Sequence, residues 1–322
     1  MGRIAKVRRS ANEAWRKAGR WRSMARMFAW VLRGLAKAVA ALPLGGAAAV
    51  ARAVGWFLAN VVRVRRAYVL ETLARCFPDK TLPERRAIYA EVCRLQTLNM
   101  VELLRYAGGR EAELAARLDV RGEEIVQKAR ARGKGVLVLI AHYGNYALLA
   151  LQVPRLFGYP LSIIAKPLKN GTLNALWWEL QQKAGVNGIP SHNAYRASVR
   201  ALRANGLVGF MLDQNRPAGQ GVFVDFFGQP ASTTPGLAVM SAHTGAPVVP
   251  VFIRREPDGR QVVEVLPLIE PPPDRKDETI RTYSAACTKI IENEIRLHPE
   301  QWLWFHKRWK SRPLETAAAP AG

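Results

Sequence analysis

The sequence predicts an α/β protein with a mixed central sheet flanked by helices and a helical N-terminal region. Residues 136–141 are six apolar residues rich in β-branched types, typical of a strand buried on both faces of a parallel or mixed sheet. Further apolar strand candidates alternate with helical patterns along the chain, which favours an α/β sheet. Almost half of the 322 residues are hydrophobic, enough for a sizeable core.

Residues 1–60 predict membrane association. The first 26 residues hold nine Lys or Arg against one acid, with Trp15 and Trp21 among them. The longest uncharged run that follows, residues 38–51, has 14 residues, whereas a spanning helix needs about 20. We expect a pair of interfacial or half-embedded helices with the basic flank on an anionic membrane surface. A tilted transmembrane helix and a hairpin packed on the protein's own core are the alternatives.

The rest of the chain predicts one globular domain over residues 61–313, with a helical layer at 61–110. In that layer, Thr81 and Glu84 match a capping box, and apolar residues recur at helical spacing as far as Gly108. In the α/β core, residues 111–313, we expect strands at 136–141, 161–165, 207–212, 247–253 and 262–266, and helices at 173–183, 236–243 and 280–297. Residues 314–322 are expected to be unstructured.

His142 directly follows the predicted buried strand, at the strand end where open α/β sheets place binding crevices. Gly144 permits a tight turn, and Asn145 is a good cap for the helix that follows. Backbone N–H groups at such a helix N-terminus can stabilise a developing oxyanion. Asp213 follows another strand candidate, so we expect it on the same rim as His142.

Residues 142–147, His-Tyr-Gly-Asn-Tyr-Ala, resemble the first signature of the lipid A biosynthesis acyltransferases, the lauroyl and myristoyl transferases of the glycerolipid acyltransferase superfamily. Residues 213–228, which begin with Asp-Gln, and residues 298–310, which contain Pro-Glu-Gln-Trp-Leu-Trp and His-Lys-Arg, extend the resemblance. It covers about residues 60–313. It implies a glycerol-phosphate acyltransferase-like fold that moves an acyl chain from acyl carrier protein or coenzyme A to a hydroxyl of a phosphorylated glycolipid, a lipid A precursor. No metal or other cofactor is implied.

The resemblance also implies roles for single residues. His142 takes the proton of the acceptor hydroxyl, and Asp213 assists substrate positioning or orients the hydrogen-bond network. Lys166 stands where the family has a basic residue, and would bind a phosphate or polarise the thioester carbonyl. The further candidates for substrate binding are Asn145, Gln214 and Arg308. The last of these is expected to face the phosphorylated acceptor or the carrier of the donor.

Residue 147 departs from the family pattern, because the family has an acid there and this chain has Ala147. A carboxylate bonded to the second imidazole nitrogen fixes the tautomer and stabilises the imidazolium. We therefore expect severely impaired catalysis, with substrate binding retained. Either an engineered Glu→Ala change or a naturally inactive lipid-binding homologue would explain the alanine, and the variant Ala147→Glu tests the expectation.

The formal net charge of +23 indicates an acidic partner. The expected partners are the thioester donor, the phosphorylated glycolipid and an anionic membrane surface, at the cytoplasmic face of the bacterial inner membrane. Another glycolipid or phospholipid acceptor, such as a phosphatidylinositol mannoside, is the alternative. A nucleic-acid partner is disfavoured, because the basic cluster adjoins an apolar segment and no recognition motif is present. The three cysteines lack metal-ligand spacing and are expected to be reduced.

Overall fold

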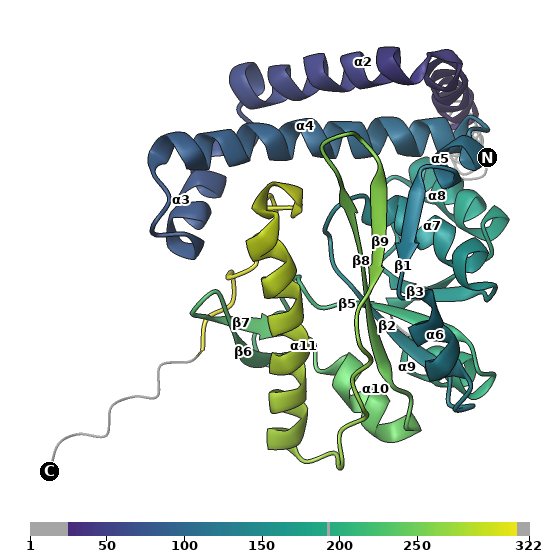
Figure 1. Cartoon of the computed structure of the whole chain (residues 1–322), viewed down its shortest axis with the longest axis vertical. Helices are drawn as coiled ribbons and strands as arrows, with labels where there is room; N and C mark the ends of the chain where they lie inside the picture. Colours follow the sequence, from purple (N-terminus) through teal and green to yellow (C-terminus); the bar gives the residue numbers. More distant parts are fainter. Residues whose placement is uncertain (1–24, 192–193, 314–322) are drawn as a thin grey trace, which may run out of the picture.

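A seven-stranded sheet forms the centre of the protein in a computed structural model that describes residues 25–191 and 194–313 (Figure 1). The strand order is β1-β9-β8-β2-β5-β3-β4, and all neighbours are parallel except β8 and β9. The strands are β1 Leu118–Arg121, β2 Val136–Ile140, β3 Leu161–Ala165, β4 Val186–Pro190, β5 Leu207–Met211, β8 Val248–Arg255 and β9 Gln261–Val265. The predicted mixed sheet is therefore confirmed. The basic residues 1–24 and the tail 314–322 lie outside the described residues.

Strand β2 is buried on both faces, as its apolar run predicts. Val136, Val138 and Ile140 contribute to one core, which α6 (Glu123–Arg130) and α7 (Tyr146–Phe157) complete. Leu137 and Leu139 contribute to a second core on the other face. Helices α9 (Ala194–Arg203), α10 (Gly236–Thr244) and α11 (Asp277–Leu297) contribute to that core, together with α3 (Arg66–Cys76) and α4 (Leu82–Ala107). Both faces being covered explains why the strand sequence shows no alternation of polar and apolar residues.

Four strands were not predicted. Strand β1 carries Asp119 and Arg121 and is half-buried, so it lacks an apolar run. Strand β4 is an edge strand that ends in Pro190, where a missing N–H is tolerated. Strands β6 (Val222–Phe226) and β7 (Gln229–Thr233) form a separate antiparallel hairpin. The predicted helix at 173–183 is α8 (Gly171–Lys183), and the helices predicted at 236–243 and 280–297 are α10 and α11.

The N-terminal hairpin, as we name residues 25–62, lies on the long helix α4 (Leu82–Ala107) (Figure 1). It consists of a helix through residues 25–41, α2 (Leu44–Phe57) and the π-helical turn η1 (Leu58–Val62). Helices α3 (Arg66–Cys76) and α5 (Glu111–Ala115) flank α4. The predicted capping box at the start of α4 is confirmed, because Thr81 and Glu84 bond each other's backbone N–H groups.

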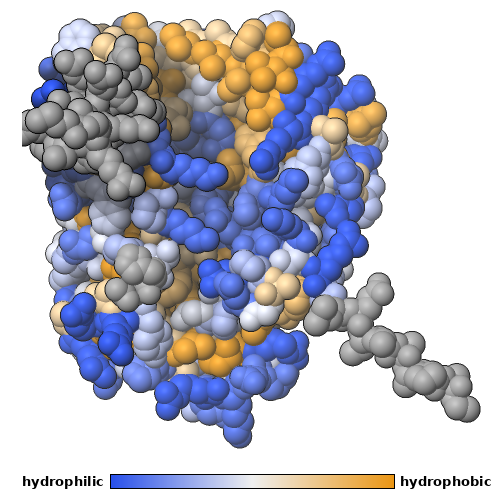
Figure 2. Space-filling model, turned by 180° about the vertical axis from the view of Figure 1, so that it is seen from behind, coloured by the Kyte–Doolittle hydropathy of each residue, from blue (hydrophilic) through white to orange (hydrophobic). Residues whose placement is uncertain are grey.

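Small residues of the N-terminal hairpin face α4, and large apolar residues face away from it. The buried residues at four-residue spacing are Ala47, Ala51, Gly55 and Ala59. The exposed ones include Val50, Val54, Trp56, Phe57 and Val61. Figure 2 shows apolar residues gathered at this end of the molecule. Small residues inside and large apolar residues outside are the pattern of helices that contact lipid. Within the described residues, Leu44–Val62 is long and apolar enough to cross a membrane.

Gly55 permits the close approach of α2 to α4, and its replacement tests that contact. A Cβ at Gly55 would lie 2.7 Å from the Cα of Arg94, which is backbone and cannot rotate away. We expect Gly55→Ala to lower the melting temperature, because overpacking costs about 1–3 kcal/mol and exceeds the roughly 1 kcal/mol gain in helix propensity. Differential scanning calorimetry in detergent measures the change.

Gly45 in the same helix is the matched control, since a Cβ there meets nothing within 4 Å. Gly45→Ala should keep or raise the melting temperature. Equal effects of the two substitutions would show that α2 does not depend on this close approach.

Candidate active site

His142 lies at the carboxyl end of β2, where its imidazole is 15% exposed. Gly144 makes the turn that follows, with φ at +57°. A Cβ at this position would lie 1.7 Å from the carbonyl oxygen of Ile253, so only glycine fits. The predicted tight turn between β2 and α7 is thus confirmed, and it brings the histidine to the lip of the sheet.

Asp213 lies two residues beyond the end of β5, the neighbour of β2 in the sheet. Ile140 pairs with Met211, so the residues two positions beyond each of them, His142 and Asp213, leave the sheet side by side. The Asp213 carboxylate accepts hydrogen bonds from His142 Nδ1 at 3.0 Å and from the His142 backbone N–H at 2.8 Å. It also accepts one from Trp302 Nε1 at 2.9 Å. Both oxygens of the carboxylate therefore have hydrogen-bond donors, although the residue is only 1% exposed to water.

These contacts leave His142 Nε2 as the nitrogen with a free electron pair. An ionised carboxylate only accepts hydrogen bonds, so Nδ1 of His142 carries the proton that it donates to Asp213. The side-chain amide of Gln214 lies 2.9 Å from His142 Nε2 and can donate to it. The ring edge is packed against Tyr146 at a centroid distance of 4.8 Å. The imidazole is held in one tautomer, with its basic nitrogen toward an exposed amide.

The pair of charges shifts both pKa values in opposite directions. Burial raises the pKa of Asp213, but His142, Trp302 and the backbone N–H outweigh burial and lower it to about 2. Burial lowers the pKa of His142, and the Asp213 carboxylate outweighs burial, so that the net pKa is above the ordinary 6.5. His142 therefore combines a stronger-than-usual base with a counter-charge that stabilises its protonated form.

Asn145 caps α7 and is only 2% exposed, so the expected contact with substrate is not open to it. Its Oδ1 accepts from the backbone N–H of Leu148 at 3.2 Å. Ala147 is half-buried in the first turn of α7. The orienting contact that the sequence analysis assigned to an acid at residue 147 is instead made by Asp213, from a different strand.

Arg308 does not face the solvent, contrary to the expectation that it meets a phosphorylated substrate. It is completely buried, and its guanidinium donates to the carbonyl oxygens of Ser232 and Gln214 and to the hydroxyl of Thr233. Burial lowers its pKa to about 10, which the charge of Asp213 partly opposes. Its place in the fold is that of a brace which fixes the backbone of Gln214 and the hairpin β6–β7.

Lys166 is exposed in the loop after β3, at the same sheet edge as His142. Strand β5 separates β3 from β2, so the loop that carries Lys166 leaves the sheet one strand farther from His142 than the loop that carries Asp213. The expected role of Lys166 stays a prediction. The role of Trp302 was not predicted from the sequence, although Trp302 lies within the signature at residues 298–310. An indole is a donor only, so a tryptophan in such a block was a signal for a buried acceptor.

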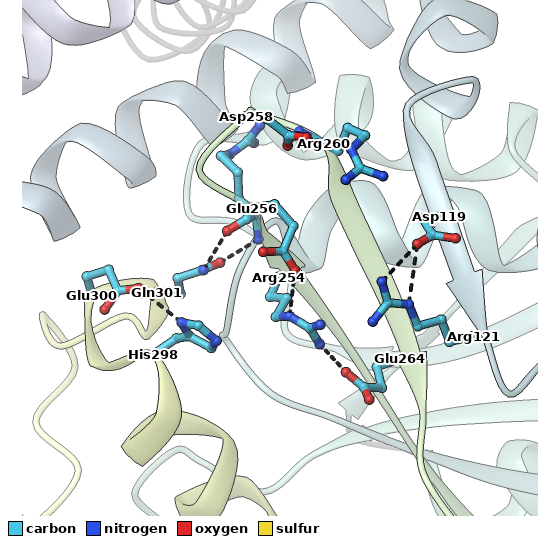
Figure 3. Close-up of polar contacts among 11 residues, drawn as sticks. Asp119, Arg121, Arg254, Glu256, Asp258, Arg260, Glu264, His298, Glu300 and Gln301 are labelled. Carbon is cyan, nitrogen blue, oxygen red and sulfur yellow. Dashed lines mark hydrogen bonds and ion pairs between the residues drawn. The ribbon is translucent and has the colours of Figure 1, made fainter.

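Gln301 ties the turn after His142 to the end of β8. Its side-chain amide bonds the backbone N–H and carbonyl of Arg255 at 2.8 and 2.9 Å. Figure 3 shows the position of Gln301 beside the β8–β9 hairpin. The backbone carbonyl of Gln301 accepts from Gly144 N–H at 2.9 Å. The ion pairs of Arg254 with Glu256 and Glu264 lie on the same hairpin (Figure 3). Within the described residues no cluster of His, Cys, Asp and Glu could hold a metal ion.

Comparison with known proteins finds a family model for this chain. The model described as bacterial lipid A biosynthesis acyltransferase matches residues 16–311. That range includes every element of the site.

Several curated proteins are similar over about four fifths of their length. The lipid A biosynthesis lauroyltransferase of Escherichia coli K12 is 27% identical over 77% of this chain and 80% of its own. The palmitoleoyltransferase of the same organism is 28% identical over 78% and 80%, and the myristoyltransferase 24% over 80% and 79%. Among solved structures, the 1-acyl-sn-glycerophosphate acyltransferase PlsC of Thermotoga maritima aligns with a TM-score of 0.36, 18% identity, 77% of this chain and 97% of that one.

Replacing Asp213 by asparagine is expected to lower the pKa of His142 below 6.5. Burial alone lowers this pKa, and the variant removes the carboxylate that outweighs burial. An NMR titration of the His142 ring measures the change. Asp79→Asn, at an exposed position, is the control and should leave the titration unaltered.

The same pair makes stability depend on pH. The raised pKa of His142 adds stability that is fully present below pH 6.5 and is lost as pH rises through the native pKa. The lowered pKa of Asp213 adds stability that is present above pH 3.8 and is lost as pH falls toward about 2. Wild type should therefore exceed Asp213→Asn in free energy of unfolding most between about pH 4 and 6.5. An unchanged His142 pKa in the variant would contradict the assignment.

Proposed function

The chain belongs to the bacterial lipid A biosynthesis acyltransferase family, and from this premise we propose that it is an O-acyltransferase. It moves a fatty acyl chain from a thioester, on acyl carrier protein or coenzyme A, to a hydroxyl of a lipid A precursor. The observation that carries the proposal is the His142–Asp213 pair, with Nδ1 bonded to a buried carboxylate and Nε2 left basic.

The reaction needs one base, one acid and a site for negative charge. The acceptor hydroxyl displaces the amide of Gln214 from His142 Nε2 and gives its proton to that nitrogen. The hydroxyl oxygen forms a bond to the thioester carbonyl carbon, and the carbonyl oxygen takes the electron pair. The C–S bond then breaks, the ester forms, and the departing sulfur receives the proton from Nε2. Helix α7 begins four residues after His142, and the N–H groups of its first turn suit the oxyanion.

Asp213 supports this cycle twice. Before proton transfer its carboxylate selects the tautomer of His142, and afterwards it offsets the charge of the imidazolium. It makes the contact whose absence was the reason to expect impairment from Ala147. We therefore propose that Asp213 is the orienting acid of this chain and that its base is functional. The impairment predicted from Ala147 stays a prediction, to be decided by activity.

The donor and acceptor follow from charge and surface. Exposed basic residues such as Lys166 and Lys307 suit a phosphorylated glycolipid or an acidic carrier. The exposed apolar face of the N-terminal hairpin suits the acyl region of a bilayer, with basic residues toward anionic headgroups. These features support a proposed location at the cytoplasmic face of the inner membrane, where thioester donors are present.

Activity assays of two variants test the proposed base. With acyl carrier protein and coenzyme A thioesters offered in parallel, mass spectrometry of the lipid product gives the rate. Asp213→Asn should lower kcat by about 10³–10⁴-fold, because the loss of an orienting aspartate leaves the imidazole in the wrong tautomer. Ala147→Glu should raise kcat less than about tenfold, because Nδ1 already has a carboxylate partner.

Asp79→Asn again serves as the control for the first variant. A rise of more than about a hundredfold in Ala147→Glu would show that Ala147 impairs the chain, as its departure from the family pattern predicts. Absence of acyl transfer in both wild type and Ala147→Glu would reject the proposed function.

Vesicle binding tests the membrane face. Replacing Trp56 and Phe57, which are 63% and 48% exposed, by aspartate should weaken binding to vesicles of neutral and anionic phospholipid. We expect a decrease of at least about tenfold in cosedimentation affinity, since burial of each such side chain contributes about 1.5–3 kcal/mol. Leu297→Asp, at a 69% exposed leucine on α11, should leave binding unchanged. Equal binding by wild type and the Trp56 and Phe57 double variant would exclude the N-terminal hairpin as the membrane face.

A further inference from the structure

A buried carboxylate on α4 lies behind the turn that carries His142. Glu102 has a side chain only 10% exposed. It accepts two hydrogen bonds from the guanidinium of Arg255, at 2.9 and 2.5 Å. It accepts a third from Asn145 Nδ2 at 2.7 Å and a fourth from Gln261 Nε2 at 3.2 Å. Four hydrogen bonds from three elements therefore converge on one carboxylate. None of the donating residues takes part in the proposed reaction cycle.

Further contacts from α4 converge on the same turn. Asn99, one helical turn before Glu102, donates from its amide to the carbonyl oxygen of Gly144 at 2.8 Å. Arg255 donates to Asn99 at 3.3 Å and is itself fixed at the backbone by Gln301. The carbonyl of Gly144 and the cap residue Asn145 are thus held from α4, and the N–H of Gly144 is held by Gln301.

The stability of the fold alone does not account for a buried ion pair of this kind. Desolvation of two charges offsets most of their attraction, and apolar residues of the same volume often stabilise a protein equally well. A carboxylate that accepts several hydrogen bonds instead fixes the orientation of the side chains that donate to it. It accepts hydrogen bonds only, so the NH₂ group of Asn145 must face Glu102 and its Oδ1 must face Leu148 N–H.

The direction of the Asn145 amide decides how α7 begins. With Oδ1 on Leu148 N–H, the cap pairs one of the N–H groups that have no intrahelical partner at the start of α7. If the amide reversed, its NH₂ group would face a backbone donor, and the first turn would lose its cap. The orientation of the candidate oxyanion site is therefore set by a carboxylate that touches neither His142 nor substrate.

We propose that Glu102 is a positioning residue for acyl transfer, which acts through Asn145 on the start of α7. The inference rests on the proposed function for its kinetic consequences. It predicts a loss in kcat rather than in KM, because the substrate-binding surface is unaltered while the groups that meet the transition state lose their geometry.

An exchange of the two side chains across their hydrogen bond tests the proposal. Glu102→Gln leaves Arg255 without its counter-charge and offers Asn145 a side chain that no longer sets its direction. Asn145→Asp places two carboxylates 2.7 Å apart. Each single variant should lower kcat about 10–100-fold, with KM within about threefold of wild type. The double variant restores one acid, one amide and the net charge, and should return kcat to within about fivefold.

The control is Glu91→Gln, the same substitution on the same helix at a half-exposed ion pair with Arg94. It should leave kcat unchanged. A Glu102→Gln protein that melts at a lower temperature but keeps kcat within about twofold would overturn the proposal, since a merely structural role has that signature.

Hydrogen exchange gives a measurement that does not depend on activity. In Glu102→Gln the amide of Leu148 should exchange at least about tenfold faster, while that of Val138 in β2 changes little. Unchanged protection at Leu148 would overturn the inference even if no acyl transfer is found. A wild-type protein without activity but with lost protection in Glu102→Gln would reject the proposed function and retain the positioning role.

Discussion

The carboxylate of Asp213 is the group on which the site depends. It joins β2, β5 and the C-terminal segment, because its three hydrogen bonds come from the backbone and ring of His142 and the indole of Trp302. A buried carboxylate that loses a donor is costly, so these elements have to be in place together. The base of the site is consequently a product of the tertiary structure. It forms only when β2 and β5 pair in the observed register.

The C-terminal segment completes this arrangement from behind. Trp302 reaches the carboxylate, and Arg308 holds the carbonyl of Gln214 beside it. Arg308 is buried among carbonyl and hydroxyl oxygens, and the negative charge of Asp213 partly compensates its own. Arg308, which would be taken for a substrate-binding residue from its basic side chain, is therefore an internal support.

The sequence was sufficient to place His142 and Asp213 on one rim, because each follows an apolar strand and parallel strands end at a common edge. It could not identify their direct bond. A signature block pairs residues a few positions apart, whereas the two partners are 71 residues apart and meet through strand register. Arg308 was misplaced because arginines are usually exposed, whereas in the fold its side chain is buried against β6–β7 and the carbonyl of Gln214. Glu102 gave no signal at all, since a single acid in an amphipathic helix is normally a solvated residue.

Helix α4 serves two layers of the molecule at once. Its 26 residues form a rod roughly 39 Å long, by the usual rise of a helix. The N-terminal hairpin packs on this helix through close glycine contacts at Gly55 and Gly108, where even a Cβ atom would clash. Asn99 and Glu102 of the same rod hold the loop behind His142. Because α4 contacts both regions, the distance between His142 and the apolar face of the N-terminal hairpin is set by the fold. For the acyl transfer proposed above, a lipid anchored by its tails at that face would bring its alcohol to His142 only if the distance along the lipid matches, which would make that distance a criterion of substrate selection.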